Sequence, residues 1–277
     1  MSEEIDLHNF YDIITVMPGL MLLGLTLARI LPIIILCPFI GGRMILSPVK
    51  IGLSLLIALF LYPYISSMQN STTISTDSFL SLSLLLKEVI IGALIGFASS
   101  ISFYAFEAAG NLIDIQRNAT IANILIPQSH EQGSLLGNFY FQLGIVIFMI
   151  MNGHHYFIEA LFESFRIIPL FSFPALINNN LLIAMTAQLF KITLQLSAPV
   201  LITLFLVDVI MGVMNRISPY FNVFFYAMPV KSAVGLLILF IMLSYVINGM
   251  MHIFADMISF IKNNNNFFLA ICENKLL

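Results

Sequence analysis

The chain has 277 residues, of which 60% are hydrophobic and only 9% are Asp, Glu, Lys or Arg. Soluble domains carry about 25% charged residues, so this composition excludes an ordinary cytosolic enzyme and a disordered protein. The 11 Lys and Arg against 14 Asp and Glu leave no basic surplus, which excludes a nucleic-acid-binding protein. We therefore expect an all-α polytopic protein surrounded by the lipid membrane.

The N-terminal sequence and the number of cysteines exclude further kinds of protein. The N-terminus is acidic and lacks a small-residue cleavage site, so we do not expect a signal peptide. Cys37 and Cys272 are the two cysteines, which excludes a disulfide framework and a four-cysteine metal site.

Long uncharged runs predict the membrane spans, because a helix needs about 20 mainly apolar residues to cross the hydrocarbon. The third run looks too long, and too polar at its end, for a simple span. The six runs cover residues 13–40, 49–65, 79–113, 135–151, 181–207 and 234–254.

The segments between these runs are predicted from their polarity. A polar loop covers residues 66–78, a short amphipathic helix lies near 156–165, and a Pro-bearing turn covers 218–229. The Asn-rich start of residues 263–277 indicates a mobile tail. No polar stretch is long enough for a second domain, so we expect one membrane domain over residues 1–277.

Loop charge gives an orientation. Arg43, Lys50, Arg216 and Lys231 lie in two loops, so the positive-inside rule favours an outside N-terminus. Six crossings would then place the C-terminal tail outside as well. Lys262 and Lys275, near the C-terminal end, contradict this placement, so loop charge alone does not settle the number of crossings.

Charges inside apolar runs are informative, because each costs about 2.5–3.5 kcal/mol at a helix centre. They indicate a conduction path, a proton relay or a polar subunit contact, and for Arg29 and Asp208 we favour a protein partner. For Lys87 and Glu88 the alternative is that the side chain reaches the interface from a span end. The informative charges, which lie among apolar residues, are Arg29, Glu88, Glu107, Lys191 and Asp208.

The third run, residues 79–113, contains a repeat of small residues and the start of a polar stripe. Gly92, Gly96 and Ser100 recur every fourth residue, which lets another helix approach closely. A polar stripe then follows one helix face and suits an aqueous cavity or a subunit interface. The stripe consists of Ser100, Tyr104, Glu107, Asn111 and Asp114, and a shorter one consists of Gln188, Lys191 and Gln195.

Residues 116–134 interrupt any regular pattern with Asn, Pro and Gly. Irregular backbone at membrane depth is tolerated only where protein or water satisfies it. The segment is therefore either a re-entrant or pore-lining loop, or a plain external loop.

Signals for catalysis are poor. His155 and Glu159 stand four residues apart beside His154, which leaves an intramembrane metalloenzyme as an alternative. However, the sequence contains no HExxH motif, no nucleotide-binding motif and no recognisable nucleophile. We expect neither enzymatic activity nor a cofactor.

Three ordered blocks of residues resemble the FliR/SctT (SpaR/YscT-like) family of export-apparatus proteins, over roughly residues 25–250. The first block is Arg29, Pro32, Pro38, Gly41, Gly42, Pro48, Lys50, Gly52 and Pro63. The second is Lys87, Glu88, Gly92, Gly96, Gly110, residues 113–117, Pro127, Gln132, Leu136, Gly137, Gly153 and His154. The third is Pro199, Asp208, Gly212, Arg216, Pro219, Asn222, Val223 and residues 229–232.

One position departs from the family pattern. The family usually has a Gly soon after its Gln-Arg pair, and this chain has Asn118 there. Because Asn tolerates positive φ better than other non-Gly residues, we expect the turn to persist.

The resemblance implies bent helical hairpins within a conical helical hetero-oligomer around a protein-export channel in the bacterial inner membrane. The implied partners are SctR, SctS, SctU and secreted unfolded proteins. It also implies a loop that plugs the closed channel, at about residues 110–127. The channel plug would comprise Gly110, Asn111, Asp114, Gln116, Arg117, Asn118 and Pro127. The subunit contacts would comprise Arg29, Glu88, Gly92, Gly96, Glu107, Asp208, Gly212, Arg216, Pro219, Asn222 and Lys231.

Two alternatives to an injectisome export-gate subunit stay open. One is a flagellar export-gate subunit of the same family, although the Glu131-Gln132 pair favours an injectisome. The other is a stand-alone secondary transporter, which would use the same intramembrane charges. The transporter reading predicts an internal two-fold repeat, and the sequence shows none.

Overall fold

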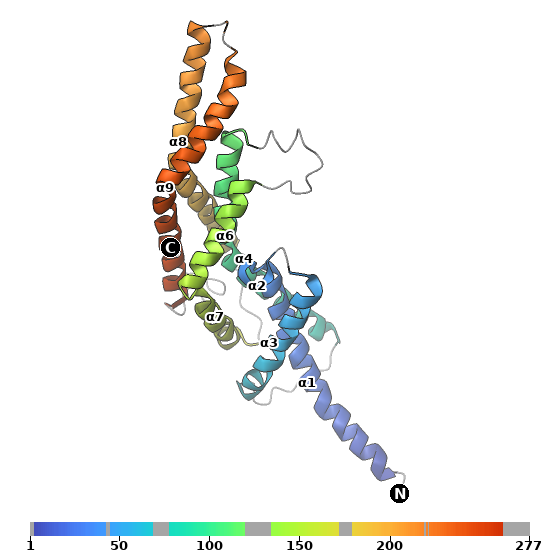
Figure 1. Ribbon diagram of the computed structural model, residues 1–277. Coiled ribbons are helices and arrows are strands. Elements are labelled where there is room, and N and C mark those ends of the chain that lie inside the picture. Colours follow the sequence, from blue (N-terminus) through green and yellow to red (C-terminus); the bar gives the residue numbers. More distant parts are fainter. Residues whose placement is uncertain are drawn as a thin grey trace. The chain divides into compact units, whose positions relative to one another are not determined.

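The computed structural model describes residues 3–42, 45–68, 78–119, 134–171, 179–218, 220 and 222–262. Within these ranges it contains helices and no strand, which confirms the all-α prediction. The helices are α1 (Glu3–Leu36), α2 (Pro38–Gly41), α3 (Ser47–Met68), α4 (Ser78–Gln116), α6 (Leu135–Ile150), α7 (Gly153–Ile167), α8 (Asn179–Ile217) and α9 (Val223–Lys262) (Figure 1).

The predicted spans coincide with these helices. Five helices are long and apolar enough to cross a membrane, and the bent pair α6–α7 adds a sixth if it counts as one span. The chain is thus a multi-pass membrane protein. The five candidate spans are Gly19–Leu36, Ser47–Ser67, Ser81–Gln116, Ile183–Ile217 and Phe225–Ser259.

The segments between the spans fit the predictions in part. The amphipathic helix is confirmed as α7. The Pro-bearing turn predicted over 218–229 is too long, because α9 begins at Val223 and contains Pro229. A Pro in the second turn of a helix removes one backbone hydrogen bond, which a helix of 40 residues tolerates. The predicted tail at 263–277 lies outside the described residues, and the single membrane domain stays a prediction.

The chain divides into two compact units. The first contains α1, α2, α3, α4 up to Ser100, and the chain from Glu159 to the end of the described α7 segment. In this unit α1 packs against α3, and α4 approaches α1 closely at two glycines. A Cβ atom added at Gly92 would lie 2.2 Å from the Arg29 carbonyl oxygen, and one added at Gly96 would lie 3.1 Å from Ile33 Cα. The predicted close approach through these two glycines is confirmed.

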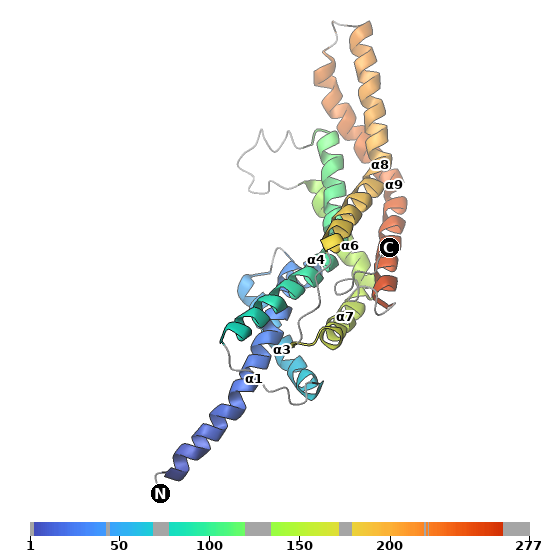
Figure 2. The same ribbon diagram turned by 180° about the vertical axis from the view of Figure 1, so that it is seen from behind.

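The second unit contains α4 from Ile101, α6, the start of α7, α8 and α9. Four buried Phe rings from α4, α6 and α9 form its core. The ring of Phe254 lies 5.2 Å from Phe103, 5.3 Å from Phe106 and 5.3 Å from Phe148. Helices α8 and α9 pack against each other, as both views show (Figure 1, Figure 2).

A sharp bend separates α6 from the start of α7 in the second unit. The two helix axes meet at 77° across Met151 and Asn152. Asn152 has φ 57°, a left-handed conformation that ends α6. At Gly153 an added Cβ would lie 2.3 Å from the Phe148 ring, so only Gly fits at the start of α7.

Candidate functional site

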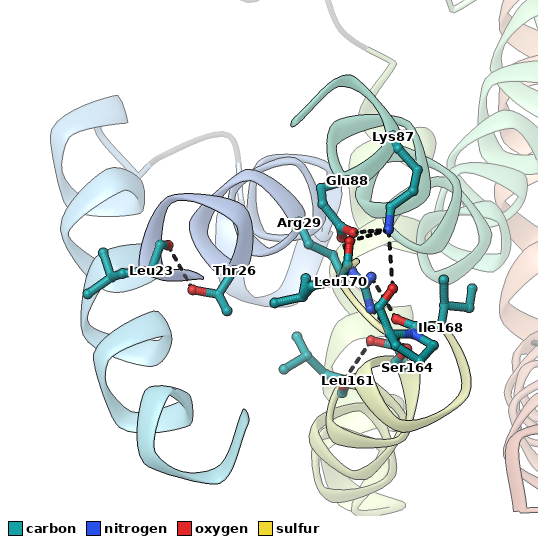
Figure 3. A network of polar contacts seen from close by, with 10 residues as sticks. Leu23, Thr26, Arg29, Lys87, Glu88, Leu161, Ser164, Ile168 and Leu170 are labelled. Atoms are coloured by element: carbon teal, nitrogen blue, oxygen red, sulfur yellow. Dashed lines mark hydrogen bonds and ion pairs between the residues drawn. The ribbon is translucent and has the colours of Figure 1, made fainter. Parts of the chain in front are cut away.

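A buried ion-pair cluster joins three helices of the first unit (Figure 3). The Arg29 Nε atom of α1 donates to the Glu88 carboxylate of α4, and both side chains are fully buried. The other Arg29 nitrogens donate to the carbonyl oxygens of Ser164 and Ile168, each at 2.9 Å. The guanidinium carbon also lies 4.4 Å from the centre of the Phe165 ring.

Lys87 adds a second cation to this cluster. Its Nζ atom lies 2.6 Å from Glu88 Oε1 and donates to the carbonyl oxygens of Pro169 and Leu170. Two cations therefore share one carboxylate. The excess positive charge faces carbonyl oxygens at the C-terminal end of α7, where the helix dipole favours a cation. The arrangement stabilises the end of α7 against α1 and α4.

A second buried site lies where α4 ends and α6 begins, in the second unit. The Asp114 carboxylate is 1% exposed. Its Oδ1 accepts from Arg117 Nε at 2.7 Å, and its Oδ2 accepts from the Ser134 hydroxyl and from the Leu136 amide at 2.9 Å. One carboxylate thus binds described residues on both sides of positions 120–133. It also lies at the N-terminus of α6, where the helix dipole favours an anion.

Two glycines bring the backbones of α4 and α6 into direct contact at this site. A Cβ atom at Gly110 would lie 2.4 Å from the Leu136 carbonyl oxygen. A Cβ atom at Gly137 would lie 2.2 Å from Asn111 Oδ1. We call the region around Asp114, bounded by Gly110–Asn118 and Ser134–Gly137, the α4–α6 base.

The end of α4 confirms the predicted turn. Asn118 has φ 63°. The Asn118 amide donates to the Ile115 carbonyl, and the Ala119 amide donates to the Asp114 carbonyl. This pair of hydrogen bonds is the Schellman motif, in which the left-handed residue is usually Gly. Asn118 therefore takes a conformation that Gly usually occupies at the end of a helix.

A second set of polar contacts joins the α4–α6 base to α8 and α9. Gln116 Nε2 donates to Asp208 Oδ2 at 3.0 Å, and Asp208 Oδ1 pairs with the Lys231 ammonium group. Lys231 also donates to the Gln116 carbonyl oxygen at 3.4 Å, which satisfies a carbonyl at the end of α4. The protein partner that we favoured for Asp208 thus lies in the same chain.

The remaining predicted residues do not join these sites. Gly212, Arg216 and Asn222 are exposed, and Arg216 makes no ion pair with any residue that the structure describes. Glu107 is half-buried on α4. Pro127 and Pro219 lie outside the described residues. The roles of all these residues, and of the buried ones, in subunit contact stay predictions.

The shorter polar stripe lies on the surface. Gln188, Lys191 and Gln195 are all exposed on α8. His154 and His155 stack with ring centres 4.2 Å apart. Among the side chains that the structure describes, no three His, Cys, Asp or Glu residues come close enough to hold a metal ion.

Sequence reasoning missed several groups at both sites. The partners of Arg29 and Lys87 include backbone carbonyls, which no residue pattern reveals. Ser134 carried a usable signal, because Ser before an apolar run marks a helix start. The structure confirms it as the N-cap of α6, accepting from the Gly137 amide.

Comparison with known proteins gives the family. The sequence model of the family "Bacterial export proteins, family 1" matches residues 20–257. Flagellar biosynthetic protein FliR of Bacillus subtilis is 28% identical over 256 residues, which are 91% of this chain and 96% of the relative. Yop proteins translocation protein T of Yersinia pestis is 36% identical over 193 residues, 69% of this chain and 73% of the relative.

A third relative is surface presentation of antigens protein SpaR of Shigella flexneri. It is 30% identical over 236 residues, which are 85% of this chain and 90% of the relative. These matches confirm the resemblance stated from the residues. The chain belongs to the FliR/SctT family, the bacterial export proteins of family 1.

Proposed function

We propose that this chain is a non-enzymatic core subunit of a type III secretion export gate in the bacterial inner membrane. It would help form, and plug at rest, the channel through which unfolded proteins cross. Family membership and the five or six apolar helices support this function. The energy for export would come from a partner ATPase and the proton gradient, because the sequence contains no nucleotide-binding motif.

The α4–α6 base is the observation that carries the plug assignment. Asp114 binds Arg117 on one side and Ser134 and Leu136 on the other. The described residues on either side of 120–133 therefore meet at one buried carboxylate. A segment anchored in this way can obstruct a channel without a hydrophobic core of its own. Asp114 would act by fixing the positions of its hydrogen-bond donors, and it would take part in no reaction.

The implied partners are SctR, SctS, SctU and the exported chain. Two surface features support assembly with other membrane subunits. Large apolar side chains cover the exposed faces of α8 and α9, among them Phe205, Ile210 and Phe240. The exposed stripe of Gln188, Lys191 and Gln195 crosses α8 within its span, and amide and ammonium groups are costly against lipid. The polar stripe suits a polytopic neighbour better than acyl chains, and the apolar faces beside it can pack against the same neighbour.

The plug is tested by replacing residues 120–133 with a linker of about six Gly and Ser residues, a length typical of helix connections. This change leaves every described residue of the α4–α6 base in place. We expect spheroplasts that contain the altered complex to swell in a small uncharged solute such as xylitol. Spheroplasts with the unaltered complex should keep their volume.

A matched control replaces residues 69–77, which lie within the predicted polar loop 66–78, with the same linker. It should give no swelling while the complex is recovered in normal amount. If the 120–133 replacement assembles normally and stays impermeable, the plug assignment is wrong. Swelling in both variants would show general damage to the membrane and would also contradict it.

A flagellar export gate is the second candidate, because the FliR relative matches 91% of the chain. The higher identity to Yop proteins translocation protein T and to SpaR favours an injectisome. The genes beside this one separate the two candidates: needle genes would support the injectisome, and flagellin genes would support the flagellum.

A further inference from the structure

Several independent contacts hold the α4–α6 base closed, and the first set is made by Asp114. Asp114 is almost completely buried and has three donors from two segments of the chain. If the two ends separated, this carboxylate would lose the Ser134 hydroxyl and the Leu136 amide. A buried carboxylate that loses its partners costs far more than an exposed one.

Backbone packing opposes separation as well. At Gly110 the α4 backbone directly contacts the Leu136 backbone of α6, whereas Gly137 of α6 contacts the Asn111 side chain and the Glu107 carbonyl oxygen of α4. The backbone contact at Gly110 includes no flexible side chain that could stretch across a widening gap. Ser134 adds a local constraint, since its hydroxyl caps α6 through the Gly137 amide while it donates to Asp114.

The base is also attached from outside. Gln116 and Lys231 connect the end of α4 to Asp208 on α8. On α9, a Cβ at Gly235 would lie 3.5 Å from Arg117 Cβ, which is ordinary contact distance. The last turn of α4 is thus held by α6, α8 and α9 together.

We propose that the α4–α6 base is a fixed frame that stays closed throughout export, with Asp114 as its positioning residue. Transport would then require no separation of α4 from α6 at Asn111 and Gly137. The inference rests on the proposed function, because it concerns how the plug is anchored. It adds to that function the statement that the α4–α6 base does not open during export.

The structure offers a site for a covalent lock. A Cβ atom at position 137 would lie 3.0 Å from Asn111 Cγ, the atom that a Cys sulfur would replace. In a disulfide, each sulfur lies about 3 Å from the opposite Cβ. The double substitution Asn111→Cys with Gly137→Cys therefore has suitable geometry. The nearest other obstacle is the Glu107 carbonyl oxygen at 3.1 Å, which requires a small shift.

The experiment compares secretion by the assembled double-cysteine complex before and after oxidation. Single-cysteine variants serve as controls. We expect no loss of secretion on oxidation. A loss that a reductant reverses would show that the base opens and would overturn the proposal. The 120–133 replacement tests the plug independently, so failure of either idea can be recognised.

A second arm tests Asp114 itself. Asp114→Asn removes the charge from all three hydrogen bonds and places an amide donor where a carboxylate oxygen accepts, so we expect the base to open at least about tenfold more often and the resting complex to leak. Oxidation of the double-cysteine pair in the same chain should abolish that leak. A leak that persists after oxidation would contradict the positioning role, as would the absence of any leak.

If the double-cysteine chain does not assemble, hydrogen exchange in the unmodified complex decides the question. The Leu136 amide donates to Asp114 and should stay equally protected in resting and secreting complexes. Faster exchange during secretion would overturn the proposal.

Discussion

Removing Arg29 is the sharpest test of the buried cluster in the first unit. Arg29→Met keeps most of the side-chain volume and removes the charge and all three donors. Glu88 would keep only Lys87, and the Ile168 carbonyl would lose its donor. The Ser164 carbonyl would still accept from the Ile168 amide, so one carbonyl is left without a partner rather than two.

The magnitude follows from these losses. Breaking a buried ion pair by removing one partner costs about 3–5 kcal/mol. Because Lys87 still neutralises Glu88, we expect the lower end of this range, about 3 kcal/mol. At about 1.4 kcal/mol per factor of ten, the open population of this unit should rise by roughly two orders of magnitude.

Cys37 provides the assay. It is a buried free thiol in the same unit, just after the α1 span. Burial raises the pKa of the Cys37 thiol to about 12, so the folded chain contains almost no reactive thiolate near neutral pH. Labelling by a maleimide dye in a Cys272→Ser background therefore reports opening. The labelling rate of Arg29→Met should rise by the same two orders of magnitude.

The matched control is Arg166→Met. Arg166 pairs with Glu163 at 3.0 Å, but its side chain is 60% exposed. Exposed pairs of this spacing contribute only about 0.3–0.5 kcal/mol, so the labelling rate should change less than about threefold. Equal rates for the two variants would refute the reasoning. The double variant of Arg29→Met with Glu88→Gln also removes the carboxylate with which Lys87 pairs, so it should label faster than Arg29→Met alone.

Two further predictions concern backbone geometry. Gly92→Ala places a Cβ 2.2 Å from the Arg29 carbonyl oxygen and should accelerate Cys37 labelling strongly, whereas Gly24→Ala, with open space around the new atom, should not. Asn118→Gly should leave the amount of recovered complex unchanged, because Gly adopts positive φ readily. Asn118→Val should reduce that amount, because a β-branched residue at φ 63° is strained. Equal recovery of the two Asn118 variants would contradict the importance of the turn.

The helices were predictable from the sequence because membrane spans are long apolar runs. All six predicted runs coincide with helices, and Gly92 and Gly96 identified the close approach of α4 to another helix. The turn boundary near Pro229 was wrong because local preference for a break gave way to the continuity of α9. Propensity describes single residues, whereas the length of a helix depends on what it packs against.

The charges were recognised as exceptional, but their partners were not predictable. Arg29 and Glu88 are 59 positions apart, and the other partners of Arg29 are backbone oxygens. Asp114 stood out as part of a polar stripe, yet its role depends on Ser134 and Leu136, 20 and 22 positions away. Such pairings are set by tertiary approach, and a single sequence contains no record of it.

Helices α8 and α9 have a consequence for how the protein is made. With 39 and 40 residues they are about 58–60 Å long at 1.5 Å per residue, roughly twice the thickness of the hydrocarbon layer. A newly synthesised copy therefore cannot bury the full length of α8 and α9 in lipid. Copies without partner subunits should be recognised by membrane quality control and degraded. The cellular amount of this chain should therefore rise and fall with the amount of the subunits that cover α8 and α9.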